Sequence, residues 1–235
     1  WIWINYILGS VSMDSILKLN PFYSEKIWGY EKWNLSTHKN GQCTIDGSQD
    51  TLIKKIVKEL PILIKIIQAN ETLSVQVHPD DVYASIHEND RGKTECWYVL
   101  EAIEGASLIC GIKEGLDKKT FSKIIEEGKI EKYLNKIEVK PGDMVYIPSG
   151  TVHAIQGGLK LIEVQQSSDI TYRIYDWGRD RELHIEKSLD VIDYKGGNKG
   201  GKIDNFTRLE TPYFTVEKIC VNDSYEDIEI GRAHV

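Results

Sequence analysis

The sequence lacks several features that would place it in common classes of binding protein. Its 29 Lys and Arg residues are outnumbered by 36 Asp and Glu, which gives a formal net charge of −7. This balance argues against nucleic acid or an anionic membrane surface as the main partner. No apolar run reaches the roughly 20 residues of a membrane-spanning helix, and no Gly-rich phosphate loop is present. An anionic ligand would therefore have to be bound by a few local cations.

Cysteine is also scarce. Cys43, Cys96, Cys110 and Cys220 lie far apart in the sequence and form no CxxC pair. This spacing indicates neither a zinc ribbon nor a disulfide framework. We therefore expect reduced thiols and a cytoplasmic protein.

The two ends of the chain differ from the rest. Residues 1–12 (WIWINYILGSVS) precede the first methionine, and they have neither a basic start nor a clear small-residue cleavage site. We expect them to be translated upstream sequence and not a signal peptide. Residues 229–235 (EIGRAHV) are what a common sequencing-adapter DNA encodes. We therefore expect the natural protein to begin at Met13 and to continue beyond Ile228.

Most of the chain consists of short strand patterns separated by Gly and Pro turns. Helical spacing is confined to residues 50–60, which Pro61 ends, to a short stretch after Pro79, and to residues 117–135. Residues 61–69 (PILIKIIQA) are rich in β-branched side chains and predict a buried strand that contains Lys65. This order of elements favours an antiparallel sandwich or barrel.

Four side chains suited to binding a metal occur in apolar strand patterns. Gln76 and His78 lie two apart in SVQVHP, so they share one face of a strand, where a polar pair is costly unless something satisfies it. Glu95 and His153 lie on two other strands. Two imidazoles, a carboxylate and an amide oxygen suit a divalent metal such as zinc. Each residue alone is weak support, because a single histidine is more often an ordinary core or surface residue.

The surroundings of His153 add a motif. Gly142 is followed by five residues, Pro148, Ser149, Gly150, two more residues and His153. This spacing resembles the second motif of the cupin barrels, G-x5-P-x-G-x2-H. The asparagine that usually follows is replaced by glycine here. The resemblance implies a mainly β fold, the cupin double-stranded β-barrel or jelly roll, with one metal inside.

Further blocks make the resemblance closer. NPFYSEKIWG, QVHPDD, GKTECWY, PSGTVHAI and LIEVQQSSDITYRIYDWGR together resemble the short bacterial form of type I mannose-6-phosphate isomerase. The resemblance implies an isomerase that interconverts mannose 6-phosphate and fructose 6-phosphate by proton transfer through a cis-enediol. It also implies one Zn²⁺ per chain, with a sugar phosphate as the partner. The implied zinc ligands are Gln76, His78, Glu95 and His153.

The resemblance also implies roles in catalysis for three residues. Glu163 matches an acidic position proposed for proton handling, and Lys93 lies on the same side of its strand as Glu95. Arg173 matches the catalytic arginine; because arginine stays protonated, we assign it to stabilising the enediolate or the phosphate. Arg179 competes with Arg173 for this role.

Lys65 and Ser74 match positions near the phosphate site of the family. Lysine is rarely fully buried without a partner, so its place in an apolar strand needs a reason. The structural alternative for Lys65 is a charged residue that protects the edge of a sheet.

The family pattern predicts how the chain divides. We expect residues 13–190 to form the catalytic cupin domain, with a small helical insertion near residues 115–135. Residues 191–228 would then be the start of a truncated C-terminal β-domain.

Two other functions fit a cupin. A cupin oxygenase would favour iron and an open site, which the glutamine ligand and the lysines match less well than a phosphorylated sugar. A metal-containing cupin that binds sugars without catalysis would not need Glu163 and Arg173 together. A coupled assay with mannose 6-phosphate, combined with metal analysis, discriminates among the three.

Overall fold

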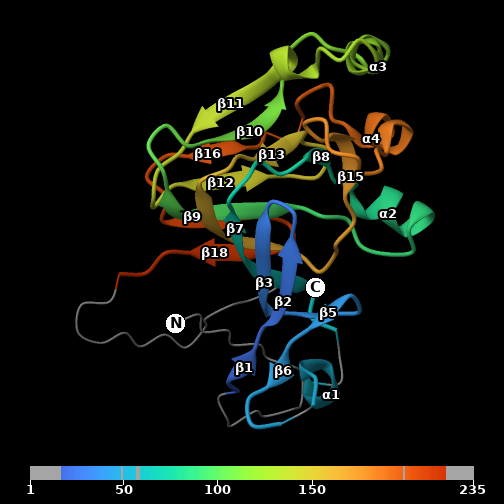
Figure 1. The fold of residues 1–235 in the computed structure, drawn as a ribbon. Helices are drawn as coiled ribbons and strands as arrows, with labels where there is room; N and C mark the ends of the chain where they lie inside the picture. Colours follow the sequence, from blue (N-terminus) through green and yellow to red (C-terminus); the bar gives the residue numbers. More distant parts are fainter. Residues whose placement is uncertain (1–16, 49, 57–58, 198, 221–235) are drawn as a thin grey trace.

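The core of the protein is a pair of facing antiparallel sheets (Figure 1). The computed structural model describes residues 17–48, 50–56, 59–197 and 199–220. The larger sheet contains, in order across it, β16 (Gly201–Ile203), β12 (Met144–Ile147), β9 (Glu95–Ala102), β14 (Leu159–Gln166), β7 (Ile62–Ala69), β3 (Gly29–Leu35) and β2 (Phe22–Lys26). The smaller sheet contains β11 (Leu134–Glu138), β10 (Ser107–Ile112), β13 (His153–Ile155), β8 (Val75–Val77) and β15 (Tyr172–Tyr175).

Short elements surround the two sheets. The remaining strands pair as β1 (Leu19–Asn20) with β6 (Thr44–Ile45), β4 (Thr37–His38) with β5 (Gly41–Gln42), and β17 (Arg208–Glu210) with β18 (Thr215–Glu217). The helices are α1 (Leu52–Ile56), α2 (Asp81–His87), α3 (Lys118–Glu126), the 3-10 helix η1 (Ile130–Tyr133) and α4 (Ile185–Val191). In the described residues, the helical pattern at 50–60 thus yields only α1, and the pattern at 117–135 yields α3 and η1. No helix in these ranges is long and apolar enough to cross a bilayer.

The space between the sheets changes from apolar to polar along each strand. On β14, Leu159 and Leu161 face inward at one end, and Glu163 and Gln165 face inward at the other. The inward face of β9 changes in the same way, from Val99 through Trp97 to Glu95. Because β14 and β9 are paired in register, the polar residues of both strands collect at the same end of the sandwich. This end carries the candidate site.

The outer faces of both sheets are covered as well. The N-terminal segments and α1 pack on Ile64 and its neighbours in β7, which explains why PILIKII is apolar on both faces. On the smaller sheet, α3 and α4 contribute Phe121 and Leu189 to a cluster with Val75 and Val77. The N-cap of α3 is Asp117, whose carboxylate accepts a hydrogen bond from the Thr120 N–H at 2.7 Å.

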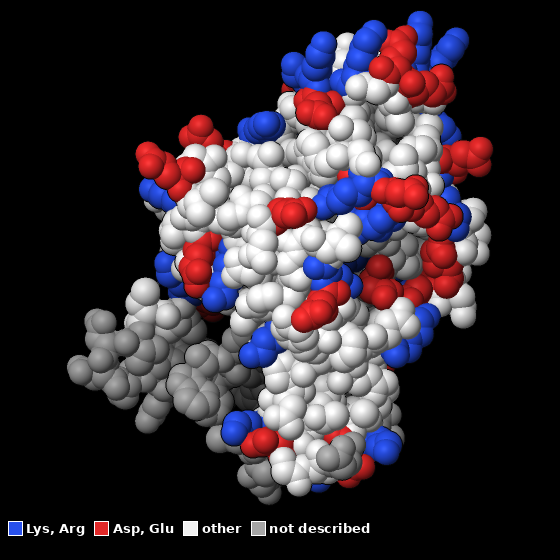
Figure 2. Space-filling model, in the orientation of Figure 1, with Lys and Arg blue, Asp and Glu red and all other residues white. Residues whose placement is uncertain are grey.

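The surface shows no broad area of positive charge on the face drawn in Figure 2. Lysine and arginine alternate there with aspartate and glutamate, and a mixed group of both signs gathers at the top, where Figure 1 places α3. This face therefore offers a negatively charged ligand no extended positive surface.

The described residues after 198 are built onto the larger sheet. β16 pairs with β12 at the sheet edge, and Phe214 packs on Met144 and Cys96 at the outer face. A domain boundary at residue 190 and a second domain beyond it stay predictions. Residues 1–12 and 229–235, for which we expect a non-native origin, lie outside the described residues.

We predict that Phe214→Ala lowers the free energy of unfolding by about 3 kcal/mol, because it removes a buried aromatic ring that anchors the β17–β18 hairpin. Urea denaturation measures the change. The control is Val82→Ala on the exposed face of α2, which should change stability by less than about 0.5 kcal/mol. Equal effects of the two substitutions would contradict the packing of the hairpin on the sheet.

Candidate metal centre

The four predicted metal ligands converge between the two sheets. Gln76 lies in β8, and His78 is the first residue after the end of this strand. His153 begins β13 and is paired in register with Gln76. Glu95 begins β9 in the facing sheet. Pro79 turns the chain away after His78. The sandwich therefore brings together side chains that are far apart in the sequence.

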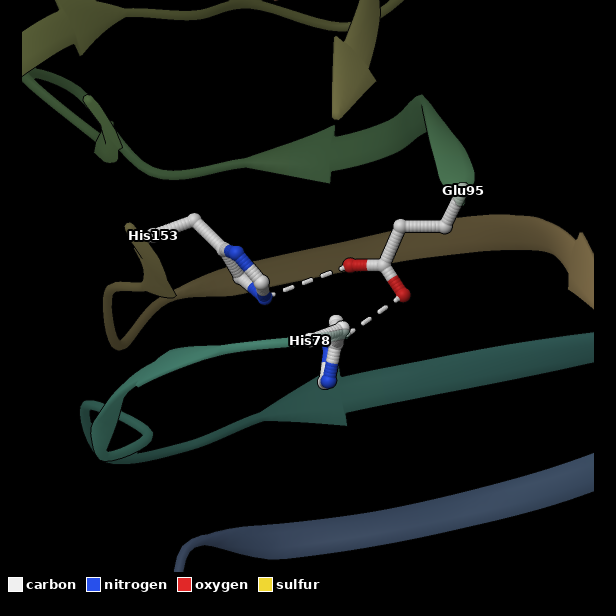
Figure 3. A group of neighbouring side chains, drawn as sticks. All are labelled: His78, Glu95 and His153. Atoms are coloured by element: carbon white, nitrogen blue, oxygen red, sulfur yellow. Dashed lines mark ion pairs between the residues drawn. The ribbon is translucent and has the colours of Figure 1, made fainter. Parts of the chain in front are cut away.

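The ligand atoms lie close to one another. The two oxygens of Glu95 point toward the two histidines (Figure 3): Oε1 lies 3.4 Å from His153 Nε2, and Oε2 lies 3.7 Å from His78 Nε2. Gln76 Nε2 lies 3.3 Å from His153 Nε2. His78, Glu95 and His153 are almost completely buried. In the part of the chain that the structure describes, they form one of two groups with metal-ligand spacing.

Backbone carbonyls orient both imidazoles. His78 Nδ1 lies 2.7 Å from the carbonyl oxygen of Ile170, and His153 Nδ1 lies 2.8 Å from that of Thr151. A carbonyl oxygen can only accept a hydrogen bond, so each Nδ1 carries the proton. The lone pair of each Nε2 then faces Glu95, which is the orientation of a histidine that binds a metal.

The amide of Gln76 can supply an oxygen to the same point. Its Oε1 accepts a hydrogen bond from the Ser74 hydroxyl at 3.3 Å, and its Nε2 faces His153. A rotation of the amide by 180° exchanges the oxygen and the nitrogen. The predicted substrate residue Ser74 is thus a neighbour of a predicted ligand.

The electrostatics of the cluster suit a divalent cation. Burial, with the charge of Glu163 as the next cause, raises the pKa of Glu95 to about 7. Burial also lowers the pKa of His153 to about 3 and that of His78 well below its usual value, so both rings stay neutral. Glu95 Oε1 is buried and receives no hydrogen bond. Neutral imidazoles around an unsatisfied carboxylate oxygen are a donor set that fits a bound metal.

Lys93 places a positive charge at this cluster. Its Nζ lies 3.0 Å from His78 Nε2, forms a close ion pair with Glu95, and lies 4.0 Å from Glu163 Oε1. The ammonium therefore contacts the atoms that would ligate a metal, so it would have to move when a metal binds.

Glu163 lies on the inner face of β14, paired with Trp97, the residue two positions after Glu95. Burial alone would raise its pKa, but the charges of Lys93 and Lys65 and a hydrogen bond from Trp97 Nε1 at 3.0 Å lower it to about 2. Lys65 Nζ lies 3.2 Å from Glu163 Oε1. Glu163 is therefore a buried, ionised carboxylate held between two lysines.

Two residues that the sequence analysis missed complete the surroundings of Lys65. Glu31 Oε2 lies 3.8 Å from Lys65 Nζ, and the ammonium lies 4.9 Å from the centre of the Trp33 ring. Trp33 Nε1 also donates a hydrogen bond to Glu31 at 2.8 Å. Lys65 is buried because it has these partners, and not because it protects a sheet edge: β7 is an interior strand. Glu31 and Trp33 are two residues apart, so the sequence indicates that they share one face of a strand. Only the register between β3 and β7 shows that this face meets Lys65.

The structure distinguishes the two candidate arginines. Arg179 is held by Asp176 at 2.8 Å and by the carbonyl of Thr72 at 2.7 Å. Arg173 is paired in register with Gln76, so it lies on the face that carries the ligands. Its Nε is buried without a hydrogen-bond partner, and its Nη1 donates to the carbonyl of Glu182 at 2.6 Å.

A second group with ligand-type spacing consists of His38, Asp90 and Asp169. The Asn40 N–H donates to His38 Nδ1 at 3.3 Å, so the proton of the neutral ring is on Nε2 and faces the two carboxylates. Lys39 already pairs with Asp90 at 3.2 Å. This arrangement joins His38 of β4 to the loops that carry Asp90 and Asp169, and in this tautomer the histidine presents a proton, and not a lone pair, to the carboxylates.

The chain is similar to mannose-6-phosphate isomerases. A family model described as the catalytic domain of type I phosphomannose isomerase matches residues 31–94. The mannose-6-phosphate isomerase of Streptococcus mutans is 41% identical over 221 residues, which cover 83% of this chain and 70% of that protein. The chain belongs to the mannose-6-phosphate isomerase family.

Other members of the mannose-6-phosphate isomerase family agree with this assignment. The Bacillus subtilis enzyme is 39% identical over 217 residues, which cover 75% of this chain and 68% of that protein. A crystal structure of the mannose 6-phosphate isomerase from Bacillus subtilis has a TM-score of 0.73 at 32% identity and covers 85% of this chain and 74% of that chain. The family and the cupin fold predicted from the sequence motifs are thus confirmed.

Asp176 offers a test of the ion pairs that hold Arg179 and Arg181. Burial alone would raise its pKa, but hydrogen bonds and charges from Arg181 and Arg179 lower it below the usual value. A lowered carboxylate pKa contributes stability that is present above the unfolded pKa of about 4 and is lost as pH falls through the folded pKa. We predict that Asp176→Asn reduces the free energy of unfolding by about 1–3 kcal/mol at pH 7.

This difference from the wild-type protein should shrink below about pH 4. Urea denaturation at pH 7, 5 and 3.5 measures it. A difference that stayed constant over this range would contradict the role of the Asp176 charge in holding Arg179 and Arg181.

Proposed function

We propose that the chain is a zinc-dependent isomerase that interconverts mannose 6-phosphate and fructose 6-phosphate. The observation that carries the proposal is the buried His78–Glu95–His153 cluster, which lies beside an ionised Glu163. The names of the relatives supply the reaction and the substrate. The reaction requires an acid/base group and stabilisation of charge on the sugar oxygens, which Glu163 and a metal held by this cluster would supply in one enclosed space.

His78, His153, Glu95 and Gln76 would hold one zinc ion. When bound, zinc acts as a Lewis acid that stabilises negative charge developing on the sugar oxygens. A mannose 6-phosphate isomerase of the same fold, 14% identical to this chain, has been solved with zinc and yttrium bound. That likeness supports the fold alone, and the donor set described above supports the choice of a borderline metal such as zinc.

Glu163 is our candidate for the proton carrier. In the direction from aldose to ketose, the base removes the proton from C2 and a proton is delivered to C1, while the hydroxyl proton on O2 is lost and O1 gains one. A cis-enediol intermediate is planar and presents the same face of C1 and C2 to the base. A single carboxylate can therefore remove the proton from C2 and deliver a proton to C1. Glu163 is ionised, as a base must be.

Lys93 and Lys65 adjust this base. Lys93 lies between Glu163 and the ligand atoms, where it could exchange protons with O1 and O2. Both lysines lower the pKa of Glu163, so a phosphorylated sugar that drew either one away would raise this pKa and strengthen the base. Arg173 and Lys65 are our candidates for binding negative charge on the substrate. Ser74 is our third candidate for substrate binding, and its hydroxyl contacts Gln76.

The first prediction for this function concerns the metal. His78→Ala and His153→Ala should each lose bound zinc and reduce isomerisation by about 100-fold or more, because each removes an imidazole ligand. Metal analysis and a coupled assay with mannose 6-phosphate measure the two effects. His87→Ala, on the exposed face of α2, is the control and should keep both properties. A His78 or His153 variant with a full equivalent of zinc and normal turnover would refute the site.

The second prediction separates chemistry from binding. Glu163→Gln should lower kcat by about 100-fold or more with little change in KM, because it keeps the shape of the side chain and removes the base. Lys65→Met should raise KM and also lower kcat, since Lys65 contacts Glu163 at 3.2 Å. Steady-state kinetics measure both constants. If both variants changed KM alone, Glu163 would not be the proton carrier.

A further inference from the structure

β14 ends in two glutamines, Gln165 and Gln166, and both side chains are buried. Adjacent residues of a strand point to opposite faces. Gln165 is paired with Glu95 across the strands, so it lies on the inner face with the metal centre. Gln166 points the other way. Burying two amides costs free energy unless their polar atoms form hydrogen bonds.

The amide of Gln165 fastens the segment that follows β14. Its Nε2 donates to the carbonyl of Gln166 at 2.7 Å and to the carbonyl of Ser168. The opposite orientation of the amide would place its oxygen against two carbonyl oxygens, so these partners decide the assignment. Both N–H groups of Gln165 are thus committed to the 166–168 turn.

This turn leads to the backbone group that orients His78. The Ile170 N–H donates to the Ser168 hydroxyl at 3.3 Å, and the Ile170 carbonyl is the acceptor for His78 Nδ1 at 2.7 Å. Three hydrogen bonds, joined through the covalent structure of Ser168 and Ile170, therefore link Gln165 to His78. If the turn moved, the imidazole would lose the partner that keeps its Nε2 deprotonated.

Gln166 fastens the segment before Glu95. Its Oε1 accepts a hydrogen bond from the Thr94 N–H at 2.9 Å. Its Nε2 donates at 2.9 Å to Asp81 Oδ1, which also accepts from the Gly92 N–H at 2.8 Å. These contacts hold residues 92–94, which include Lys93 and lead directly into Glu95 at the start of β9.

We propose that Gln165 and Gln166 are positioning residues of the metal centre, whose two amides fasten the segments that orient His78 and Glu95. The inference rests on the proposed zinc site. His153 has a different orienting partner, because the Thr151 carbonyl accepts from its Nδ1. The protein therefore contains an internal reference for the effect.

The test compares zinc affinity in Gln165→Met, Gln166→Met and Gln68→Met. Methionine has nearly the length of glutamine but cannot form the amide hydrogen bonds. Gln68 lies in the same sheet near the other end of β7, where the same change serves as the matched control. Competition of the zinc-loaded protein with a chromophoric chelator measures the affinity. We expect about tenfold weaker zinc binding in the first two variants and no change in the third.

A second readout separates positioning from general destabilisation. Long-range ¹H–¹⁵N spectra report the protonated nitrogen of each imidazole, so Gln165→Met should alter the His78 signature and leave that of His153 unchanged. If this variant does not fold, Gln165→Asn replaces it, because its shorter amide cannot reach Ser168.

The outcomes are distinct. Wild-type zinc affinity and an unchanged His78 tautomer in the folded variants would overturn the positioning role and leave the zinc site standing. Absence of zinc binding in the wild-type protein would overturn the proposed function and this inference together.

Discussion

The structure depends on the cost of burying negative charge between two sheets. Glu95 and Glu163 lie within the sandwich, where an isolated carboxylate would be protonated or would destabilise the fold. Lys65 and Lys93 supply two positive charges beside these two carboxylates, and the neutral imidazoles of His78 and His153 lie against Glu95. A divalent cation bound to Glu95 would have to displace the Lys93 ammonium from that carboxylate. The ionised side chains at this end of the sandwich therefore stabilise one another.

The sandwich can carry such a site because its interior is divided. The apolar cluster around Trp97, Leu159 and Leu161 fills one end, and the polar residues fill the other. Trp97 belongs to both parts: its ring packs with the apolar core, and its N–H binds Glu163. Apolar packing thus fixes the position of the carboxylate, and a fixed carboxylate would need less reorganisation if Glu163 is the base that we propose.

Much of the site could be predicted from the sequence, because its signals are local. The alternation of Gln76 and His78 in one strand and the turn before His153 both specify where a side chain points. The motifs also identified the family and the fold. The roles of the individual site residues stay predictions, although the structure brings Gln76, His78, Glu95, His153 and Lys93 together.

Other features depend on which strands become neighbours, and no local pattern shows this. The contacts of Lys65 with Glu31 and Trp33 arise only when β3 lies beside β7. The choice between Arg173 and Arg179 likewise needed the pairing of β15 with β8 and the position of Asp176. The support that Gln165 gives to His78 passes through backbone carbonyls, which have no sequence signature.

The metal site that we propose between the two sheets consists of Gln76, His78, Glu95 and His153. Diffraction from crystals grown with zinc, with data collected on both sides of the zinc absorption edge, tests it most directly. We expect one anomalous peak within about 2.0–2.2 Å of both Nε2 atoms, of a Glu95 oxygen and of the Gln76 amide oxygen. A peak at His38, Asp90 and Asp169, or no peak between the sheets, would contradict it.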